Sequence, residues 1–412
     1  MNIAMFTDAY YPRINGVSTS VHYYASELVK LGHKVCIVCL DYSKKENDEI
    51  FRDEELNDKE LNYEVFRIPS AYLFASKEDR AARPDKFPAM KNAMKKFSPD
   101  VIHINSEWMV AYFGVIYAVH KKVPVIYTFH TLWEDYLQNY IPFLPKPWMK
   151  KAGKSLQKYY LKHADTIIAP TKEIVSIIKK YKIKKPIDII PTGISDFRKH
   201  YTEENIAETS EHLYNQFPQL KGKDILLFVG RIVKEKNLTF LLDVLETIRK
   251  TNPNTALLLI GGGPYEEQLK KTVSKKKCDD SVIFYGYANF DETICFYKIA
   301  KVFVFPSKTE TQGLVTTEAM LAGLPVVAIG SLGTIDIMQG NNGGFMVKDD
   351  VAEFSQKVKL LLENEAVYKT KSEEAVKWAL RMEISTLTSK LLSCYEKAIQ
   401  IKELKQQKKN SK

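Results

Sequence analysis

Two carboxylates, Glu310 and Glu318, lie in a segment whose residue types suit a polar ligand. An apolar run ends at Phe305, a polar loop containing Glu310 and Gly313 follows, and an apolar run of helical character begins near Leu314. This order predicts a helix that begins at the carboxyl edge of a parallel sheet, where free amide groups bind phosphate or sugar oxygens. Because carboxylates accept hydrogen bonds from vicinal diols, the pair is predicted to hold hydroxyl groups on two parts of one ligand. The alternative is that both side chains are solvated, or that Glu310 complements the helix dipole.

The elements that would position these carboxylates follow an alternating pattern. In the first half of the chain, short apolar runs are separated by helix-length segments. The first helix is expected to be capped by Ser18 or Thr19 and to end at Gly32. The apolar runs of this half are Ile3–Phe6, Val35–Leu40, Val101–Ile104, Val123–Phe129, Thr166–Ala169 and Ile187–Ile190. Such alternation predicts a parallel sheet with helical crossovers.

The pattern restarts after a stretch of low hydrophobic density. Its five further runs are Ile225–Val229, Ala256–Ile260, Val282–Tyr285, Val302–Phe305 and Val326–Ile329. We therefore predict an α/β protein of two doubly wound, Rossmann-like domains facing each other across a cleft. The expected boundaries are 1–195 for the N-terminal domain, 196–222 for an irregular connection, 223–382 for the C-terminal domain, and 383–412 for a C-terminal helix with a lysine-rich tail.

Composition excludes several classes of protein. The chain has 412 residues, 45% of them hydrophobic and 27% charged, as in a globular protein of about two domains. It has no run of eighteen apolar residues, so no transmembrane helix is expected. The first eight residues lack the basic and apolar regions of a secretory signal, and the five cysteines form no disulfide framework. These features predict a cytoplasmic protein. Cys36 and Cys39 lie within an expected strand and are interpreted as core residues.

Basic charge is concentrated in one segment. Residues 146–185 contain twelve lysines and only two acidic residues, Asp165 and Glu173. The charge of this segment, 12 − 2 = +10, equals the net charge of the whole chain. Such a region attracts phosphates of anionic lipid or of nucleic acid. The alternative is a solvated, lysine-rich surface.

The segment with the two carboxylates resembles the glutamate-x7-glutamate signature of family 4 glycosyltransferases, which are retaining enzymes of GT-B architecture. Other matches fall where that family would place them. Gly230-Arg231 and Lys234-Glu235-Lys236-Asn237 are similar to the family's basic pair that binds the nucleotide diphosphate. Asn15-Gly16-Val17 resembles its N-terminal glycine loop, and Thr128-Phe129-His130-Thr131 resembles its active-site histidine segment. The resemblance spans nearly the whole chain.

The resemblance implies a role for each matching residue. The N-terminal domain would bind the acceptor and the C-terminal domain the nucleotide sugar. Glu310 would hold sugar hydroxyls, Glu318 the ribose hydroxyls, and His130 a hydroxyl of the sugar or the acceptor. The catalytic residues would be His130, Glu310, Arg231 and Lys236. The donor would bind at Gly16, Arg231, Lys236, Gly262, Glu310, Gly313, Leu314, Val315 and Glu318.

The chemistry of glycosyl transfer is consistent with these roles. A nucleoside diphosphate leaves with growing negative charge, so fixed cations such as Arg231 and Lys236 lower the barrier. The sequence contains no Asp-x-Asp motif, which many sugar-nucleotide enzymes of another architecture use to hold a metal. We therefore expect no metal and no cofactor. Gly261-Gly262-Gly263 is not the Gly-x-Gly-x-x-Gly fingerprint, so a nicotinamide cofactor is not expected, although Asp41 ends the second strand where a ribose-binding acid would be. The triplet is interpreted as a site of close approach to the nucleotide, or as a plain turn.

The sequences of two segments indicate the class of acceptor molecule. The segments 130–136 and 307–313 are similar to those of glucosyltransferases that make glycosyl diacylglycerols. The next stretch combines aromatic side chains with the start of the lysine cluster, which is typical of a peripheral membrane face. Its predicted acceptor and membrane residues are Tyr136, Trp148, Lys150, Lys151, Lys154 and Lys158. The alternative is a hydrophobic lid with solvated lysines. Two features of the acceptor-binding half depart from the family pattern. They are the segment His103-Ile104-Asn105 and the insertion 43–64.

The predicted activity is that of a retaining hexosyltransferase, moving glucose from UDP-glucose to 1,2-diacylglycerol on the cytoplasmic face of an anionic membrane. A polar glycan, a protein glycan or a phosphoinositol lipid is the alternative acceptor. A non-catalytic nucleic-acid-binding protein is the third hypothesis. The sequence contains no RNP, KH, zinc-finger or helix-turn-helix pattern, so nucleic acid is not expected as a partner.

Overall fold

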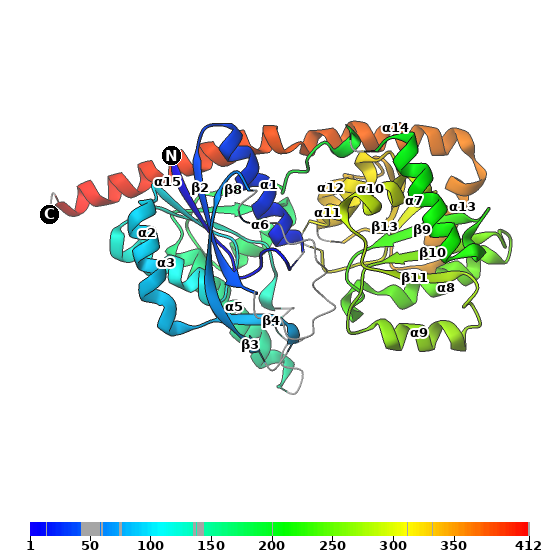
Figure 1. The fold of residues 1–412 in the computed structure, drawn as a ribbon, viewed down its shortest axis with the longest axis horizontal. Coiled ribbons are helices and arrows are strands. Elements are labelled where there is room, and N and C mark those ends of the chain that lie inside the picture. Colours follow the sequence, from blue (N-terminus) through cyan, green and yellow to red (C-terminus); the bar gives the residue numbers. More distant parts are fainter. Residues whose placement is uncertain are drawn as a thin grey trace. The chain divides into compact units, whose positions relative to one another are not determined.

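The computed structural model describes residues 1–412 except 14, 43–57, 59–60, 74–75, 135–136, 138–143, 200, 311, 332 and 411–412. The chain forms two units. The first comprises Met1–Gly193 together with Ile384–Lys412, and the second comprises Ile194–Glu383. Each unit contains one sheet with helices on both of its faces (Figure 1).

The first unit contains an eight-stranded sheet in the order β4-β3-β2-β1-β5-β6-β7-β8. Its strands are β1 (Asn2–Phe6), β2 (Lys34–Asp41), β3 (Glu64–Leu73), β4 (Ser76–Ala82), β5 (Val101–Ile104), β6 (Val125–Thr128), β7 (Thr166–Ala169) and β8 (Ile187–Ile189). All neighbouring strands are parallel except β3 and β4, which are antiparallel. The four-residue strands β5, β6 and β7 are buried throughout, as expected for a parallel sheet covered on both faces.

Six described helices cover this sheet. They are α1 (Gly16–Lys30), α2 (Phe87–Phe97), α3 (Met109–Lys121), α5 (Lys146–His163), α6 (Lys172–Lys180) and α15 (Ile384–Asn410). The apolar faces of α2, α3, α5 and α6 share one core with the sheet, whereas α15 packs against α1 and against β6 and β7 on the other face. The 27-residue helix α15 therefore belongs to the first unit, although it follows the second in sequence.

The second unit contains a parallel six-stranded sheet in the order β11-β10-β9-β12-β13-β14. Its strands are β9 (Asp224–Val229), β10 (Thr255–Ile260), β11 (Val282–Gly286), β12 (Val302–Phe305), β13 (Val326–Ile329) and β14 (Gly344–Val347). Its helices are α7 (Glu203–Gln216), α8 (Leu238–Arg249), α9 (Glu266–Lys275), α10 (Phe290–Ile299), α11 (Leu314–Leu321), α12 (Gly333–Met338), α13 (Val351–Glu363) and α14 (Glu365–Ala379). Helix α8 packs against α13, α7 against α10, and α11 against α14, and one apolar core unites them with the sheet.

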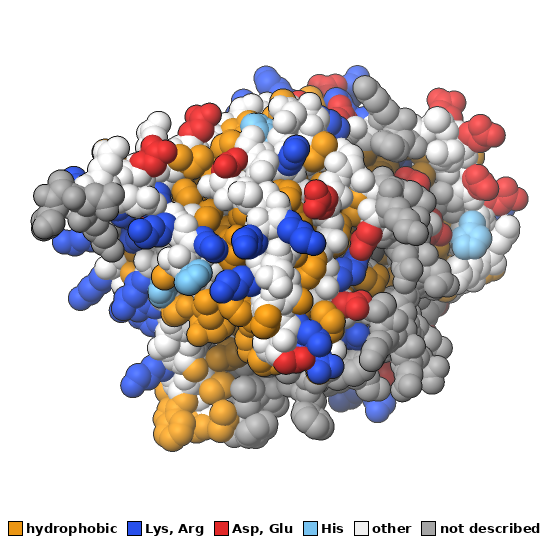
Figure 2. All heavy atoms as spheres, turned by 60° about the vertical axis from the view of Figure 1, so that its left-hand side comes forward, with side chains coloured by type: hydrophobic (Ala, Val, Ile, Leu, Met, Phe, Trp, Pro, Cys, Tyr) orange, Lys and Arg blue, Asp and Glu red, His pale blue; other side chains and the backbone are white. Residues whose placement is uncertain are grey.

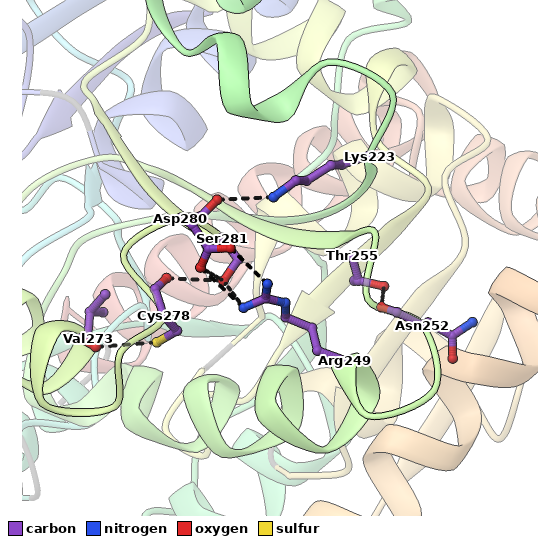
Figure 3. A network of polar contacts seen from close by, with 8 residues as sticks. All are labelled: Lys223, Arg249, Asn252, Thr255, Val273, Cys278, Asp280 and Ser281. Atoms are coloured by element: carbon purple, nitrogen blue, oxygen red, sulfur yellow. Dashed lines mark hydrogen bonds and ion pairs between the residues drawn. The ribbon is translucent and has the colours of Figure 1, made fainter.

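Ion pairs and hydrogen bonds within the protein close the amino edge of this second sheet (Figure 3). Arg249, at the end of α8, donates to both carboxylate oxygens of Asp280 at 3.3 and 2.8 Å and to Oγ of Ser281 at 2.8 Å. Lys223 Nζ donates to the Asp280 carbonyl at 3.1 Å. These contacts join the residues that immediately precede β9 and β11 to the end of α8, so this edge has a structural role.

Several predictions about the elements need correction. The expected cap of the first helix at Ser18 or Thr19 is wrong: Asn15 is the cap, and its side chain accepts from the amides of Val17 and Ser18. Residues 196–222 are not irregular, because they contain α7, whose helix is capped by Thr202. They belong to the second unit, and 383–412 belong almost entirely to the first.

Three strands, β3, β4 and β14, were not expected from the sequence. Strand β3 contains Pro69, a residue that weakens a strand pattern, and β14 has only four residues, the first of which is Gly344.

Candidate active site

The carboxyl ends of β9 and β12 mark the point in the second sheet where the strand order reverses. From β9 the chain winds outward to β10 and β11, and it then returns to β12 on the other side of β9. Open α/β sheets bind ligands in the crevice outside such a reversal. The segment after β9 carries Arg231 and Lys236, and the segment after β12 carries Glu310 and Gly313. The topology thus brings together the two segments that the sequence analysis had singled out separately.

Lys236 and Glu310 form an ion pair in this crevice, although they are 74 positions apart. The ammonium group of Lys236 also lies over the Phe305 ring, 5.8 Å from its centroid. On the carboxylate side, Ser307 Oγ donates to Glu310 Oε1 at 3.5 Å, and the Glu310 carbonyl accepts from the Gly333 amide at 2.9 Å. Both charged groups are therefore held at the ends of adjacent strands.

The ionisation of Lys236 is affected by its surroundings. Burial and the nearby positive charge of Arg231 lower the pKa of Lys236 to about 8, although Glu235 acts in the opposite direction. At neutral pH Lys236 is mostly protonated. This crevice therefore holds two cations, Arg231 and Lys236, which suit a diphosphate.

The glycine triplet packs directly against the Arg231 segment. A Cβ on Gly263 would lie 2.5 Å from the Ile232 carbonyl oxygen, and one on Gly261 would lie 2.2 Å from that of Gly230. Hydrogen bonds join the two segments, since the Ile232 amide donates to the Gly262 carbonyl at 2.8 Å. The triplet is therefore required for contact within the protein itself. A Cβ on Gly262 would meet the Tyr287 ring at 2.7 Å.

Helix α11 begins in the same crevice. Gly313, with a left-handed φ of 79°, precedes Leu314 as the cap residue, and as a glycine it offers no side chain to the first amides of the helix. Leu314 and Val315 are half-buried there. One turn further on, Glu318 is half-buried, and Tyr297 on α10 donates to its Oε2 at 3.0 Å. Burial raises the pKa of Glu318, and the hydrogen bond from Tyr297 opposes that shift.

The first unit has its own strand reversal, between β1 and β5. Asp8, which follows β1, is buried at this point and accepts from Ser106 Oγ at 2.6 Å and from the Val110 amide at 2.8 Å. Further bonds from the amides of Trp108 and Ala111 place this carboxylate at the start of α3. Burial raises the pKa of Asp8, and these hydrogen bonds oppose the shift. Asp8 therefore caps α3, a helix that begins 101 positions later in the chain.

His130 lies just beyond the end of β6. Its Nε2 is 3.3 Å from Oδ1 of Asn105, which follows the neighbouring strand β5. Burial lowers the pKa of His130 to about 4, so the imidazole is neutral at physiological pH. His103 lies nearby on β5, hydrogen-bonded to Tyr395 of α15 at 2.8 Å and to Thr128 at 2.7 Å. Gly16 is the first residue of α1.

Glu107 is a buried carboxylate beside this histidine segment. Its Oε1 accepts from Tyr127 at 2.5 Å, and its Oε2 accepts from Trp133 Nε1 at 2.6 Å. Burial raises the pKa of Glu107 to about 7, although both hydrogen bonds act in the opposite direction.

Helix α5 presents two different faces. Its buried residues, Met149, Gly153, Gln157, Tyr160 and Leu161, follow helical spacing and face the core. Trp148, Lys150, Lys151 and Lys154 are exposed, with 68% of the Trp148 side chain accessible, and Lys158 is half-buried. Tyr136 lies outside the described residues, as does most of the insertion 43–64. In Figure 2, lysine and arginine side chains lie among hydrophobic ones on the face that is turned forward.

Comparisons with known proteins agree with the motifs. A Glycosyltransferase Family 4 model matches residues 14–197, and a Glycosyl transferases group 1 model matches residues 211–378. The alpha-monoglucosyldiacylglycerol synthase of Streptococcus pneumoniae is 34% identical over 333 residues, which cover 80% of this chain and 71% of that protein. The enzyme of the same name from Acholeplasma laidlawii is 31% identical over 357 residues, which cover 85% and 86% of the two chains.

The chain belongs to glycosyltransferase family 4. Its fold is that of the GT-B glycosyltransferases: the Anabaena protein HepE, solved in complex with UDP-glucose, matches it with a TM-score of 0.72 at 15% identity, over 95% of this chain and 98% of that one. The expectations of family and fold class are confirmed. Within the described part of this glycosyltransferase, no helix is long and apolar enough to span a membrane.

The glycosyltransferase contains site features that the sequence analysis missed. Asp8 and Glu107 stand alone in the sequence, and only the order of the strands brings them to the same edge as His130. Tyr112 is exposed on α3, as is Trp108 immediately before it, and the Tyr112 ring lies 5.7 Å from that of Tyr159 on α5. The available signal was the spacing of two large aromatic residues, Trp108 and Tyr112, four positions apart at the start of an apolar helical segment.

Proposed function

We propose that this glycosyltransferase transfers glucose from UDP-glucose to 1,2-diacylglycerol, with retention of the anomeric configuration, to make a glycosyl diacylglycerol. The observation that carries the proposal is the 34% and 31% identity to two enzymes named alpha-monoglucosyldiacylglycerol synthase, each over most of its length. We place donor binding in the second unit and acceptor binding in the first.

The crevice at β9 and β12 supports the donor half of the proposal. Arg231 and Lys236 would bind the diphosphate, together with the amides at the start of α11. When the phosphates arrive, Lys236 would exchange its ion pair with Glu310 for one with the donor. Glu310 would then be free to accept hydrogen bonds from sugar hydroxyls, while Glu318, held by Tyr297, would accept them from the ribose.

The proposed reaction is a single exchange of bonds at the anomeric carbon. The acceptor hydroxyl oxygen bonds to that carbon on the face from which UDP departs, as the carbon–oxygen bond to the β-phosphate breaks. The hydroxyl proton passes to the departing phosphate oxygen. Arg231 and Lys236 stabilise the charge that grows on the diphosphate, a role that metal ions fill in other sugar-nucleotide enzymes. We propose that no metal or cofactor is needed.

The surface of the first unit supports a membrane-bound acceptor. A tryptophan and lysines exposed on one helix suit the headgroup region of an anionic bilayer, where aromatic rings insert and each lysine contributes about 1 kcal/mol. Trp108 and Tyr112, at the start of α3, are further exposed aromatic residues of this unit. We propose peripheral binding to the cytoplasmic face of the membrane.

Product analysis by mass spectrometry tests the proposal. The protein is incubated with a panel of UDP-sugars and anionic liposomes that do or do not contain diacylglycerol. We expect a hexosyl diacylglycerol only with UDP-glucose and only in the diacylglycerol liposomes. Glu310→Gln should lower the transfer rate at least about 100-fold, because the lost carboxylate acts on the sugar as charge develops.

Other outcomes separate the parts of the proposal. Slow hydrolysis of UDP-glucose under every lipid condition would support the proposed donor site but contradict diacylglycerol as the acceptor. Polar glycans would then be tested as acceptors. A Glu310→Gln variant with unchanged transfer would contradict the assigned site. Binding of UDP to that variant, measured by calorimetry, shows that the protein is folded.

A further inference from the structure

Three contacts hold the segment that directly follows His130. Gln157 Nε2, on the buried face of α5, donates to the Thr131 carbonyl at 2.6 Å. Gly153, one turn earlier, lies so close to the same segment that a Cβ there would be 2.4 Å from the Trp133 carbonyl oxygen. Trp133 Nε1 donates to Glu107 at 2.6 Å.

The bond to Glu107 differs from the other two because it ties the segment to the sheet rather than to α5. Glu107 follows β5, and Tyr127, which donates to its other oxygen, belongs to β6. Glu107 is 2% exposed and Trp133 is 5% exposed. The indole group can only donate, so the bond exists only while an acceptor occupies the position of Oε2.

A buried carboxylate costs more than a neutral side chain of similar shape, and this one has no cation among the contacts described for it. Asp8 adds a second buried carboxylate whose charge also raises the pKa of Glu107. Stability of the core alone therefore does not account for Glu107. Its two hydrogen bonds instead fix the position of Trp133 relative to Tyr127 of β6. His130 lies between Tyr127 and Trp133 in the chain.

We propose that Glu107 is a positioning residue for the acceptor side of the active site: through Trp133 it holds the 130–133 segment in place and so orients His130. The inference rests on the proposed function only in assigning His130 to that reaction. It extends the site to a residue that touches neither donor nor acceptor. A hydrogen bond between buried groups suits this task because it is directional and, at 2.6 Å, short.

Three variants test the proposal. Glu107→Gln keeps an oxygen for Trp133 and an amide group that can donate to the Tyr127 oxygen, so it is the conservative replacement. Glu107→Ala removes the acceptor altogether, and Trp133→Phe removes the donor while preserving an aromatic ring. Arg249→Ala is the matched control: it breaks polar contacts at the amino edge of the second sheet, an edge to which no donor or acceptor residue is assigned.

The first measurement does not depend on activity. The pKa of His130 is followed by NMR of the imidazole carbon-bound proton, with the resonance assigned from His130→Gln. In Glu107→Ala and Trp133→Phe we expect this pKa to rise from about 4 toward the ordinary value near 6.5, because the released segment exposes the ring to water. Removal of a carboxylate charge alone would lower the pKa, so a rise specifically reports release. Glu107→Gln removes the same charge but keeps both hydrogen bonds, so it should not raise this pKa, and Arg249→Ala should leave it unchanged.

The second measurement separates acceptor from donor kinetics. Glu107→Ala and Trp133→Phe should lower kcat/KM for the lipid acceptor by about 10-fold to 100-fold, the usual effect of a misplacement near 1 Å. The KM for UDP-glucose should stay within about 2-fold, and Glu107→Gln should retain most of the wild-type rate.

Either of two results would overturn the inference. One is an unchanged His130 pKa in folded Glu107→Ala protein, and the other is a loss that affects donor and acceptor constants alike. If the protein transfers sugar to some other acceptor, the NMR measurement still tests the inference, because it does not depend on the acceptor. The kinetic constants are then measured with that acceptor. Failure of the proposed function is thereby distinguished from failure of this inference.

Discussion

At the scale of single residues, the candidate site depends on charged groups placed where the fold keeps them from water. Lys236 and Glu310 pair at the ends of adjacent strands, and burial shifts the pKa of Lys236 to about 8. Glu318 and Glu107 have raised pKa values because their carboxylates are buried. Shifted pKa values are common at functional sites because catalysis requires groups whose pKa is adjusted by their surroundings.

The lowered pKa of Lys236 predicts how donor binding depends on pH. The protonated lysine binds phosphate, and it is lost as the pH rises through about 8. The KM for UDP-glucose should therefore increase above pH 8, by up to about tenfold per pH unit if only the protonated form binds. Steady-state kinetics between about pH 6.5 and 9.5 measure this.

Lys236→Arg is the control for that prediction. Arginine stays charged throughout this range, so the variant should show no such increase, whatever its absolute KM. A flat KM in the wild-type protein up to about pH 9.5 would contradict the assignment of Lys236 to the diphosphate.

At the scale of elements, the two edges of the second sheet have different roles. The carboxyl edge carries cations and carboxylates at the reversal of strand order, whereas the amino edge is closed by Arg249, Asp280 and Lys223. Residues at the carboxyl edge should therefore affect catalysis, and those at the amino edge should affect stability.

Arg249→Ala tests this division. It removes hydrogen bonds to Asp280 and Ser281 in a partly exposed position, so we expect the free energy of unfolding to fall by roughly 1 kcal/mol. Denaturant unfolding measures the loss. The KM for UDP-glucose should be unchanged, and a clear increase in it would show that the two edges are not independent.

At the scale of the whole molecule, charge is distributed unevenly along a chain of net charge +10. The basic segment 146–185 includes α5, whose buried face packs in the core of the first unit and whose lysines are turned outward. The fold thus separates the part of α5 that stabilises the unit from the part available to an anionic surface.

Charge reversal of Lys150, Lys151, Lys154 and Lys158 to Glu tests membrane binding. At about 1 kcal/mol per lysine, we expect at least a 100-fold weaker affinity for anionic liposomes in sedimentation assays at low salt. Survival of transfer to a detergent-dispersed acceptor would show that these lysines serve docking rather than chemistry.

The matched control reverses Lys250, Lys271, Lys275 and Lys277 of the second unit, which are exposed and give the same change in net charge. Liposome binding should survive in this variant. Equal loss in both variants would indicate a nonspecific effect of net charge, and no loss in the first would contradict the membrane role of α5.

The sequence by itself determined the alternation of strands and helices, the GT-B fold class and the donor motif. These features are local: apolar periodicity reports burial, and the loop from Phe305 to Gly313 lies between a strand and a helix that are adjacent in the chain. The sequence could not reveal strands as short or as weakly patterned as β3 and β14, because few residues carry the signal.

Only the tertiary structure decided which distant residues meet. Lys236 meets Glu310, Asp8 caps α3, Glu107 holds Trp133, and α15 joins the first unit. Periodicity shows that a residue is buried or that a strand ends, but the partner across a sheet edge depends on the order of the strands. That order is set by the packing of the whole unit, so these contacts have no signature in the local sequence.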